Sequence, residues 1–419
     1  MFHDLENGRA RAFVDLLARR DIEGTGPGAP LAREVHRIDR QIQRGRVLHA
    51  ASGATGPVPD EHGLLVERKR QIALLRRLDA DLAQTVAVQV PPLPRIRHRL
   101  SRGEALAYVM PSDGPRSAYR LLLVDAHGAR LVDTGVDSVA LRRVLRTLSS
   151  ERASHGAQTR RVEQLSTQLA LQRWAPRARL YLVPSGDFHL MPWGALDLPE
   201  GLEIVVLPTG SWLTRRPPSG DFETRAVVVG APEFGEQFPP LPGARSEARL
   251  IARQYGVDAI LGTEATLAEV RARVGTGSQV LHLATHGAFD ARAPLHSAVV
   301  LSDGRQARSV TALDLFEQPL HSRLVVLSAC ESGLAQGEAG DDYLGLARSF
   351  YLGGAVSVLN SLWPVADEPT ARFMQVFHEH ARRGEFARGW RAARDRLRDE
   401  GLPPSSYGAF VLGGSAARS

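Results

Sequence analysis

The hydrophobic positions of the first 100 residues follow a helical period. Residues 3–20 and 60–88 place apolar side chains every three to four positions, which is the spacing of one face of an α-helix. The segment 51–60, ASGATGPVPD, is rich in Gly and Pro and predicts an exposed loop. The pattern therefore predicts an N-terminal helical region over 1–100, and no 34-residue repeat is visible in it.

Short apolar runs between 101 and 214 predict strands. Three of them are separated by Asp/Gly turns and predict a small meander: EALAYVMP, YRLLLVDA and ARLVDTG. A helix is predicted over about 155–173. Two later runs, ARLYLVPSG and LEIVVLPTG, have the composition of buried strands.

The pattern changes again after the polar, Pro-rich segment 215–225. Apolar runs now alternate with amphipathic segments, which predicts an α/β fold with a mostly parallel sheet covered by helices over 215–419. In such a sheet the reacting groups gather at the carboxyl ends of the strands. The predicted strands are AVVVGAP, DAILG, QVLHLATHG, AVVLS, RLVVLSAC and AVSVLNSLWPV, and the predicted helices lie around 243–255, 266–274, 342–352 and 367–383.

Composition narrows the class of protein. The chain has 419 residues, of which 43% are hydrophobic and 23% charged, enough for one large core or two ordinary ones. No run of 18 apolar residues is present, and the N-terminus combines acidic residues with an amphipathic pattern. We expect a soluble, cytoplasmic protein without a membrane partner.

The positive charge is spread along the chain. The formal net charge is +6, and Lys69 is the only lysine, so the basic residues are almost all Arg. A nucleic-acid site would gather such residues in one stripe with aromatic side chains. The densest run, Arg68 to Arg70, falls in a helical pattern and is interpreted as a solvated helix face. Direct nucleic-acid binding is not expected.

Two predicted strands end in reactive side chains. QVLHLATHG ends in His286 and Gly287, and RLVVLSAC ends in Cys330. Parallel neighbours would bring the imidazole and the thiol together, and the imidazole could then take the thiol proton to form the nucleophilic thiolate. The backbone N–H groups of Gly287 and Cys330 are candidate donors to an oxyanion.

The same residues could also have purely structural roles. A single Cys at a strand end is often a small buried hydrophobe, and a strand His is often a core residue with satisfied hydrogen bonds. His282, four residues before His286, is interpreted as packing rather than metal binding, because no third ligand is evident. One cysteine excludes a cysteine-based zinc site, and no Walker or dinucleotide Gly pattern is present, so neither a metal nor a cofactor is expected.

Several ordered motifs resemble a known family. HLATHG, VVLSACESG and GDDYLGLARSFYLGGAVSVLNSLWPVAD are similar to the CHAT domain, a relative of caspases and separases among the Cys/His peptidases. The resemblance covers about 100–414. It implies a caspase-like sheet with a catalytic half over 215–419 and a degenerate, pseudo-caspase half over 101–214, which we expect as a companion sheet packed against the catalytic half. It also implies His286 as base and Cys330 as nucleophile.

The resemblance to separases suggests a pocket for the residue before the cut. Asp367 follows the SLWPVA segment, at the place where those relatives carry an acidic residue. Its alternative role is that of a helix N-cap. Acidic residues near the thiol would favour a basic P1 side chain by charge complementarity, namely Glu331, Glu338, Asp341 and Asp342. Trp363 is a candidate wall of the peptide groove, and equally a core residue.

The expected function is therefore that of a cysteine endopeptidase that cleaves a specific partner protein after a basic residue. The family context implies a bacterial protein in antiviral defence or programmed cell death, switched on by an activating partner. A co-encoded gasdermin-like effector precursor is one candidate substrate, by analogy. The competing hypothesis is a catalytically silent scaffold with the same fold, which only binds partner proteins.

Overall fold

The computed structural model forms two compact units, Met1–Pro92 and Leu93–Ser419. We treat each unit by itself. The residues that the structure describes are 2, 5, 28, 30–35, 37–38, 41–42, 60–78, 92–110, 114, 116–150, 152–214, 224–275, 277–288, 297–317, 320–328, 345–352 and 355–414.

The described part of the first unit is helical. Its longest element is α3, Glu61–Leu78. Ile72 and Leu75, on one face of α3, are buried with Ala32 and Val35 in a small apolar cluster. This agrees with the helical period of the sequence over 60–78. The other predicted helix, 3–20, lies almost entirely outside the described residues.

The second unit is built from alternating strands and helices. Its strands are β1 (Glu104–Val109), β2 (Arg120–Asp125), β3 (Ala129–Asp133), β4 (Arg179–Val183), β5 (Glu203–Val206), β6 (Thr224–Pro232), β7 (Ile260–Gly262), β8 (Ser278–Ala284), β9 (Gly287–Ala288), β10 (Ala298–Ser302), β11 (Ala307–Thr311), β12 (Ser322–Ser328), β13 (Ser357–Ser361) and β14 (Phe410–Gly414). Its helices are α5 (Leu93–Arg97), α6 (Ser138–Leu148), α7 (His155–Leu169), α8 (Leu171–Trp174), η1 (Gly186–Leu190), η2 (Gly210–Thr214), α9 (Pro242–Tyr255), α10 (Leu267–Val274), α11 (Ala312–Glu317), α12 (Gly345–Leu352), α13 (Asp367–Ala381), α14 (Phe386–Asp399) and α15 (Pro404–Tyr407).

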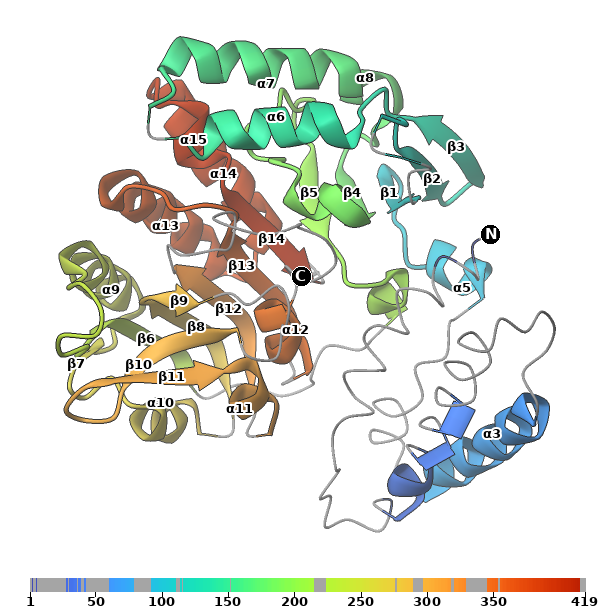
Figure 1. Cartoon of the computed structure of the whole chain (residues 1–419), viewed down its shortest axis with the longest axis horizontal. Coiled ribbons are helices and arrows are strands. Elements are labelled where there is room, and N and C mark those ends of the chain that lie inside the picture. The colour runs from blue at the N-terminus through green and yellow to red at the C-terminus, as the bar shows by residue number, and fades with distance from the viewer. Residues whose placement is uncertain are drawn as a thin grey trace. The chain divides into compact units, whose positions relative to one another are not determined.

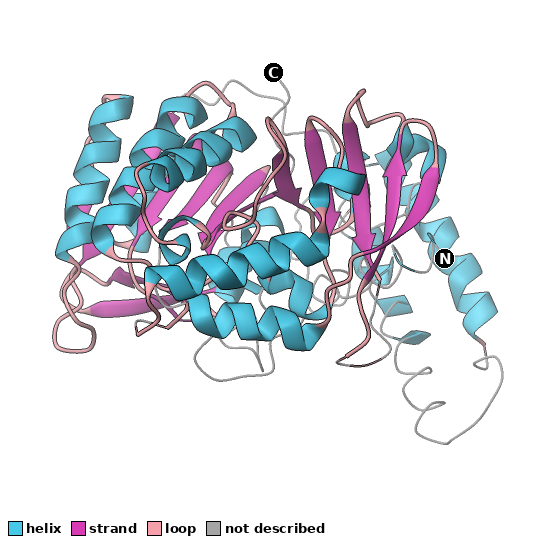
Figure 2. Cartoon of the chain, turned by 90° about the horizontal axis from the view of Figure 1, so that it is seen from above, coloured by secondary structure: helices cyan, strands magenta, loops and turns pink. Residues whose placement is uncertain are grey.

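One sheet of eleven strands forms the centre of this unit. Its order is β3-β2-β1-β4-β5-β14-β13-β12-β8-β6-β7. The β1–β2–β3 meander is antiparallel, as the turn signals predict, and β13, β12, β8, β6 and β7 are parallel neighbours. Figure 2 shows the strands as one row with helices along it. The mostly parallel, helix-flanked sheet is the predicted fold class.

The two halves are joined edge to edge, which corrects the prediction of a companion sheet packed against the catalytic half. The joint is β14, which is antiparallel to β13 and parallel to β5, where Gly413 lies opposite Val206. Figure 1 shows this C-terminal strand beside the much earlier β5. The hydrophobic pattern does not predict β14, because FVLGG is short and ends in two glycines, a composition that weakens a strand signal.

Two further predictions are wrong in detail. AVVLS forms β10, but β10 pairs with β9 and β11 in a separate antiparallel sheet of three strands and not in the main sheet. The helix predicted over 155–173 is divided at Ala170, which adopts the left-handed conformation with φ 45° and ends α7.

Among the described residues, no helix combines the length and apolar character needed to cross a bilayer.

Strand β14 has no room for a side chain at its last residue, Gly414. Gly414 has φ +99°, and a Cβ there would lie 2.2 Å from the carbonyl oxygen of Val356. Gly201 also has a positive φ, +72°, but a Cβ would meet nothing within 4 Å. We predict that Gly414→Ala lowers the free energy of unfolding by about 3 kcal/mol, and Gly201→Ala by about 1 kcal/mol. Urea denaturation measures both, and equal losses would contradict the steric role of Gly414.

Candidate functional site

The parallel strands β12, β8 and β6 end at one edge of the sheet. In the register of β8 with its neighbours, Ala284 lies opposite Ser328 at the end of β12 and opposite Gly230 near the end of β6. The segments that follow these strands therefore leave the sheet at the same level. This is the edge at which the alternating pattern predicts the reacting groups.

His286 lies two residues beyond the end of β8, and its side chain is held on three sides. It is 6% exposed. Its Nε2 lies 2.8 Å from the carbonyl oxygen of Pro239, and its ring contacts the rings of Phe234 and Phe238 at centroid distances of 4.8 and 5.3 Å. Phe238 stacks on the imidazole and Phe234 meets it edge to face.

The Pro239 carbonyl settles which nitrogen of a neutral His286 carries the proton. A carbonyl oxygen only accepts, so Nε2–H must donate, and Nδ1 keeps its lone pair. That arrangement leaves Nδ1 able to act as a base. The sequence does not predict this partner, because any residue type can supply a backbone carbonyl. The sequence feature at this place is the run FGEQFPP between β6 and α9, which contains Pro239 and both phenylalanines.

The backbone around His286 directs the amide of Gly287. Val300 donates its N–H to the His286 carbonyl at 2.9 Å, and Gly287 lies opposite Val299 in the β9–β10 pairing. Gly287 is therefore in the non-hydrogen-bonded type of antiparallel pair, whose N–H groups point away from the partner strand. Among the described strands, β9 has no neighbour on that other side. The Thr285 hydroxyl bonds the Val300 carbonyl and fixes the turn.

Several predicted site residues lie outside the described residues. These are Cys330, Glu331, Glu338, Asp341 and Asp342. The last described residue of β12 before them is Ser328, and its carbonyl accepts the N–H of Thr285 at 3.3 Å.

Asp367 is the first residue of α13 and is exposed. The N-cap position belongs to Ala366, so the alternative of Asp367 as N-cap is wrong by one residue. Its carboxyl group packs over Gly243 in the first turn of α9. A Cβ on Gly243 would lie 2.0 Å from Oδ2 of Asp367, so a side chain at position 243 would displace this exposed carboxylate.

Trp363 is a core residue, which corrects its assignment to the peptide groove. The side chain is 1% exposed, and its indole N–H donates to the Ser405 carbonyl at 2.9 Å. An indole buried and bonded in this way has no face left for a substrate. The sequence could not decide this because a Trp after a buried strand fits both roles.

His282 belongs to a buried polar chain below the edge. Its Nδ1 lies 3.1 Å from Nε2 of His378, whose Nδ1 lies 3.0 Å from the Tyr255 hydroxyl. On its other side, Nε2 of His282 lies 3.0 Å from Oε1 of Glu247. No group of three or more possible metal ligands occurs in the part of the chain that the structure describes.

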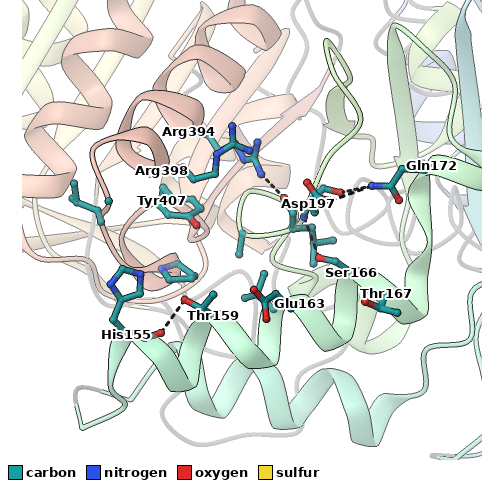
Figure 3. Close-up of a pocket in the computed structure, with 16 residues that line it drawn as sticks. His155, Thr159, Glu163, Ser166, Thr167, Gln172, Asp197, Arg394, Arg398 and Tyr407 are labelled. Carbon is teal, nitrogen blue, oxygen red and sulfur yellow. Dashed lines mark hydrogen bonds between the residues drawn. The ribbon is translucent and has the colours of Figure 1, made fainter.

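A separate cavity of about 520 Å³ opens between α7 and the α14–α15 region (Figure 3). Arg394, only 1% exposed, donates to the carbonyls of Gly194 and Leu196 in its wall. Its other lining charges have both signs and include Arg398, Glu163 and Asp197. None of the predicted site residues lines this cavity.

Comparison with known proteins identifies the class. A family model described as "CHAT domain" matches residues 157–412, more than half of the chain. The chain belongs to the CHAT domain family, and its fold is that of the caspase-like peptidases. Membership supports a protease-type function of the cysteine peptidase kind.

Individual relatives resemble only part of the chain. It is 25% identical over 301 residues to tetratricopeptide repeat protein 28 of Homo sapiens, covering 57% of this chain and 12% of that protein. The Mus musculus protein of the same name is 24% identical over 256 residues, covering 48% and 10%. The separase in the Saccharomyces cerevisiae separase–securin complex has a TM-score of 0.52 at 10% identity, covering 85% of this chain and 34% of that chain. The chain thus spans about an eighth of the curated relatives and a third of the separase.

The buried His378 predicts a loss of stability in acid. Burial, with a smaller effect of His282, lowers the pKa of His378 well below its ordinary 6.5. Below pH 6.5 the unfolded chain binds a proton that the folded protein does not. The free energy of unfolding should therefore fall on acidification from this residue by up to about 1.4 kcal/mol per pH unit. Urea unfolding at pH 7.5 and 5.5 measures the fall, and His378→Phe should reduce it. An unchanged pH dependence in that variant would contradict the assignment.

Proposed function

We propose that this protein is a cysteine endopeptidase in which Cys330 is the nucleophile and His286 the general base. One observation carries the proposal: the hydrogen bond of His286 to the Pro239 carbonyl, at the carboxyl edge of the sheet, leaves Nδ1 as a base.

The strand register supports a meeting of the two groups. Ser328 lies opposite Ala284, and Cys330 and His286 each follow these residues by two positions. Two residues span at most about 7 Å. Cys330 and His286 therefore follow, at the same distance along the chain, two residues that lie opposite each other on adjacent strands.

The reaction follows from these parts. Nδ1 of His286 takes the thiol proton, and the sulfur of Cys330 attacks the peptide carbonyl carbon. The amide of Gly287, directed away from β10, and the amide of Cys330 donate to the oxyanion. His286 then gives its proton to the leaving amine, and a thioester remains. A water molecule, deprotonated by His286, attacks the thioester, and the acid product and the thiol are released.

Specificity is the second part of the proposal. The exposed carboxylate of Asp367 lies at the same edge as His286, over Gly243, whose lack of a side chain leaves room for it. With Glu331 and Asp341, it would attract a cationic P1 side chain. We infer cleavage after Arg or Lys in a peptide that binds as an extended strand.

The biological setting stays a proposal drawn from the family. A bacterial CHAT protease would act in the cytoplasm in antiviral defence or cell death, after activation by a partner protein. A co-encoded effector precursor, such as a gasdermin-like protein, is the candidate substrate. The scaffold hypothesis stays open, since the curated relatives are named for their tetratricopeptide repeats and not for an activity.

Cys330→Ala separates the enzyme from the scaffold. We predict that it lowers the cleavage rate of a co-encoded partner by at least about 1000-fold, because no other side chain supplies the nucleophile. Binding of the partner should be unchanged, as measured by calorimetry. Equal cleavage by both proteins would refute the peptidase, and binding without cleavage by the wild type would favour the scaffold.

Asp367→Asn tests the P1 preference. The variant should lower kcat/KM for peptides with Arg or Lys at P1 by about tenfold or more, because the loss of one ion pair of about 1.4 kcal/mol is a tenfold change. Glu368→Gln, which removes the next carboxylate along α13, is the matched control and should change little. A panel of fluorogenic peptides measures both. Faster cleavage after acidic or apolar residues would show that Asp367 does not select the substrate.

A further inference from the structure

The buried chain of polar groups below His286 joins three elements of the fold. Its links run from Glu247 on α9 to His282 on β8, then to His378 on α13, and back to Tyr255 at the end of α9. All four side chains are at most 8% exposed, and both histidines are fully buried. The chain therefore ties α9 at two points to a strand and a second helix.

The protons in this chain have one consistent order. Burial raises the pKa of Tyr255, so its hydroxyl keeps its proton, and burial keeps His378 neutral. If the Tyr255 hydroxyl donates to Nδ1 of His378, then Nε2–H of His378 donates to Nδ1 of His282. The remaining N–H of His282 then faces the Glu247 carboxylate. That last contact is short, 3.0 Å, but bent away from ideal hydrogen-bond geometry.

Each of the three tied elements begins or ends at the catalytic edge. β8 ends two residues before His286. α9 begins at Pro242, three residues after Pro239, whose carbonyl holds Nε2 of His286. α13 begins with Asp367. A shift of α9 along β8 would therefore move the carbonyl relative to the imidazole that it orients.

Two further contacts connect α9 with α13. Gln254 donates its side-chain N–H to the Gln375 carbonyl at 3.1 Å near one end. At the other end, the Asp367 side chain packs against Gly243. The two helices thus start together at the edge, and the polar chain fixes their position on the strand between these contacts.

Stability alone does not account for polar groups at this place. Replacing a buried polar or ionic cluster by apolar side chains of similar volume is often neutral or stabilising. Apolar contacts are, however, not directional, whereas hydrogen bonds permit only one alignment of their partners. A directional lock is useful where a small displacement would separate a catalytic group from its partner.

We propose that Glu247, His282, His378 and Tyr255 are positioning residues, which hold α9 and α13 on β8 and thereby align His286 with the Pro239 carbonyl. The inference rests on the proposed Cys330–His286 pair. It assigns no contact with the substrate to any of the four residues. Their loss should weaken the pairing of imidazole and thiol and leave substrate binding unchanged.

The single cysteine of the chain allows a test that needs no substrate. Iodoacetamide reacts with the thiolate, so the pH dependence of alkylation reports the pKa of Cys330 alone. In the wild type, pairing with His286 should hold this pKa below the ordinary value of about 8.5. In His378→Phe it should rise by about one unit, and alkylation at pH 7 should slow by several-fold, up to about tenfold. His378→Gln, which keeps a polar group towards His282, should restore part of the effect.

His380→Phe is the matched control. This neighbouring histidine lies on the same helix but pairs with Glu385, outside the polar chain, and its replacement should leave the alkylation profile unchanged. Tyr255→Phe removes one hydroxyl and keeps the ring. It should shift the profile in the same direction by a smaller amount, and it serves if His378→Phe does not fold. With a peptide substrate, both variants should lower kcat and leave KM unchanged.

The outcomes separate the two proposals. A low thiol pKa in the wild type that rises in the Phe variants but not in His380→Phe supports the positioning role. A low pKa that stays low in folded His378→Phe and Tyr255→Phe overturns that role and leaves the peptidase proposal intact. An ordinary thiol pKa in the wild type overturns the Cys330–His286 pair and, with it, the positioning role.

Discussion

The hydrogen bond between His286 and the Pro239 carbonyl is the interaction on which the site depends. It selects the tautomer with a free Nδ1, and two phenylalanine rings hold the imidazole in that orientation. A backbone carbonyl carries no formal charge, so it orients the ring without the strong pull on the proton that a carboxylate would exert. The geometry of the loop between β6 and α9 thus sets the base that the chain can offer.

The loop between β6 and α9 is anchored by the helix that follows it. Its C-terminal end runs into α9. Buried hydrogen bonds join α13 to α9 and to β8, and the close contact of Glu247 with His282 joins α9 to β8. Burial lowers the pKa of His378, so this residue remains neutral in the folded state, which costs stability in acid. A pH-dependent loss of stability thus arises from the same polar groups that are proposed to align His286 with the Pro239 carbonyl.

The single sheet gives the two halves a common framework. β14, the last described strand, lies between β13 of the half with His286 and β5 of the other half. The inner strands of the row bond both neighbours, so β14 makes the two halves parts of one hydrogen-bonded sheet. The half without His286 is therefore a structural extension of the sheet that carries His286 and not a separate body.

The sequence by itself determined the α/β class, most strands, and the position of His286 after β8, because apolar runs, turn residues and a strand-end histidine are local signals. It also predicted that Asp367 lies between a strand and a helix, although not its contact with Gly243. Only the tertiary structure decided that Trp363 is core, that β10 leaves the main sheet, that β14 joins the halves, and that Pro239 orients His286. These features depend on pairings between residues distant in the chain, and backbone carbonyls and glycine-rich strands carry no residue-type signal of such partners.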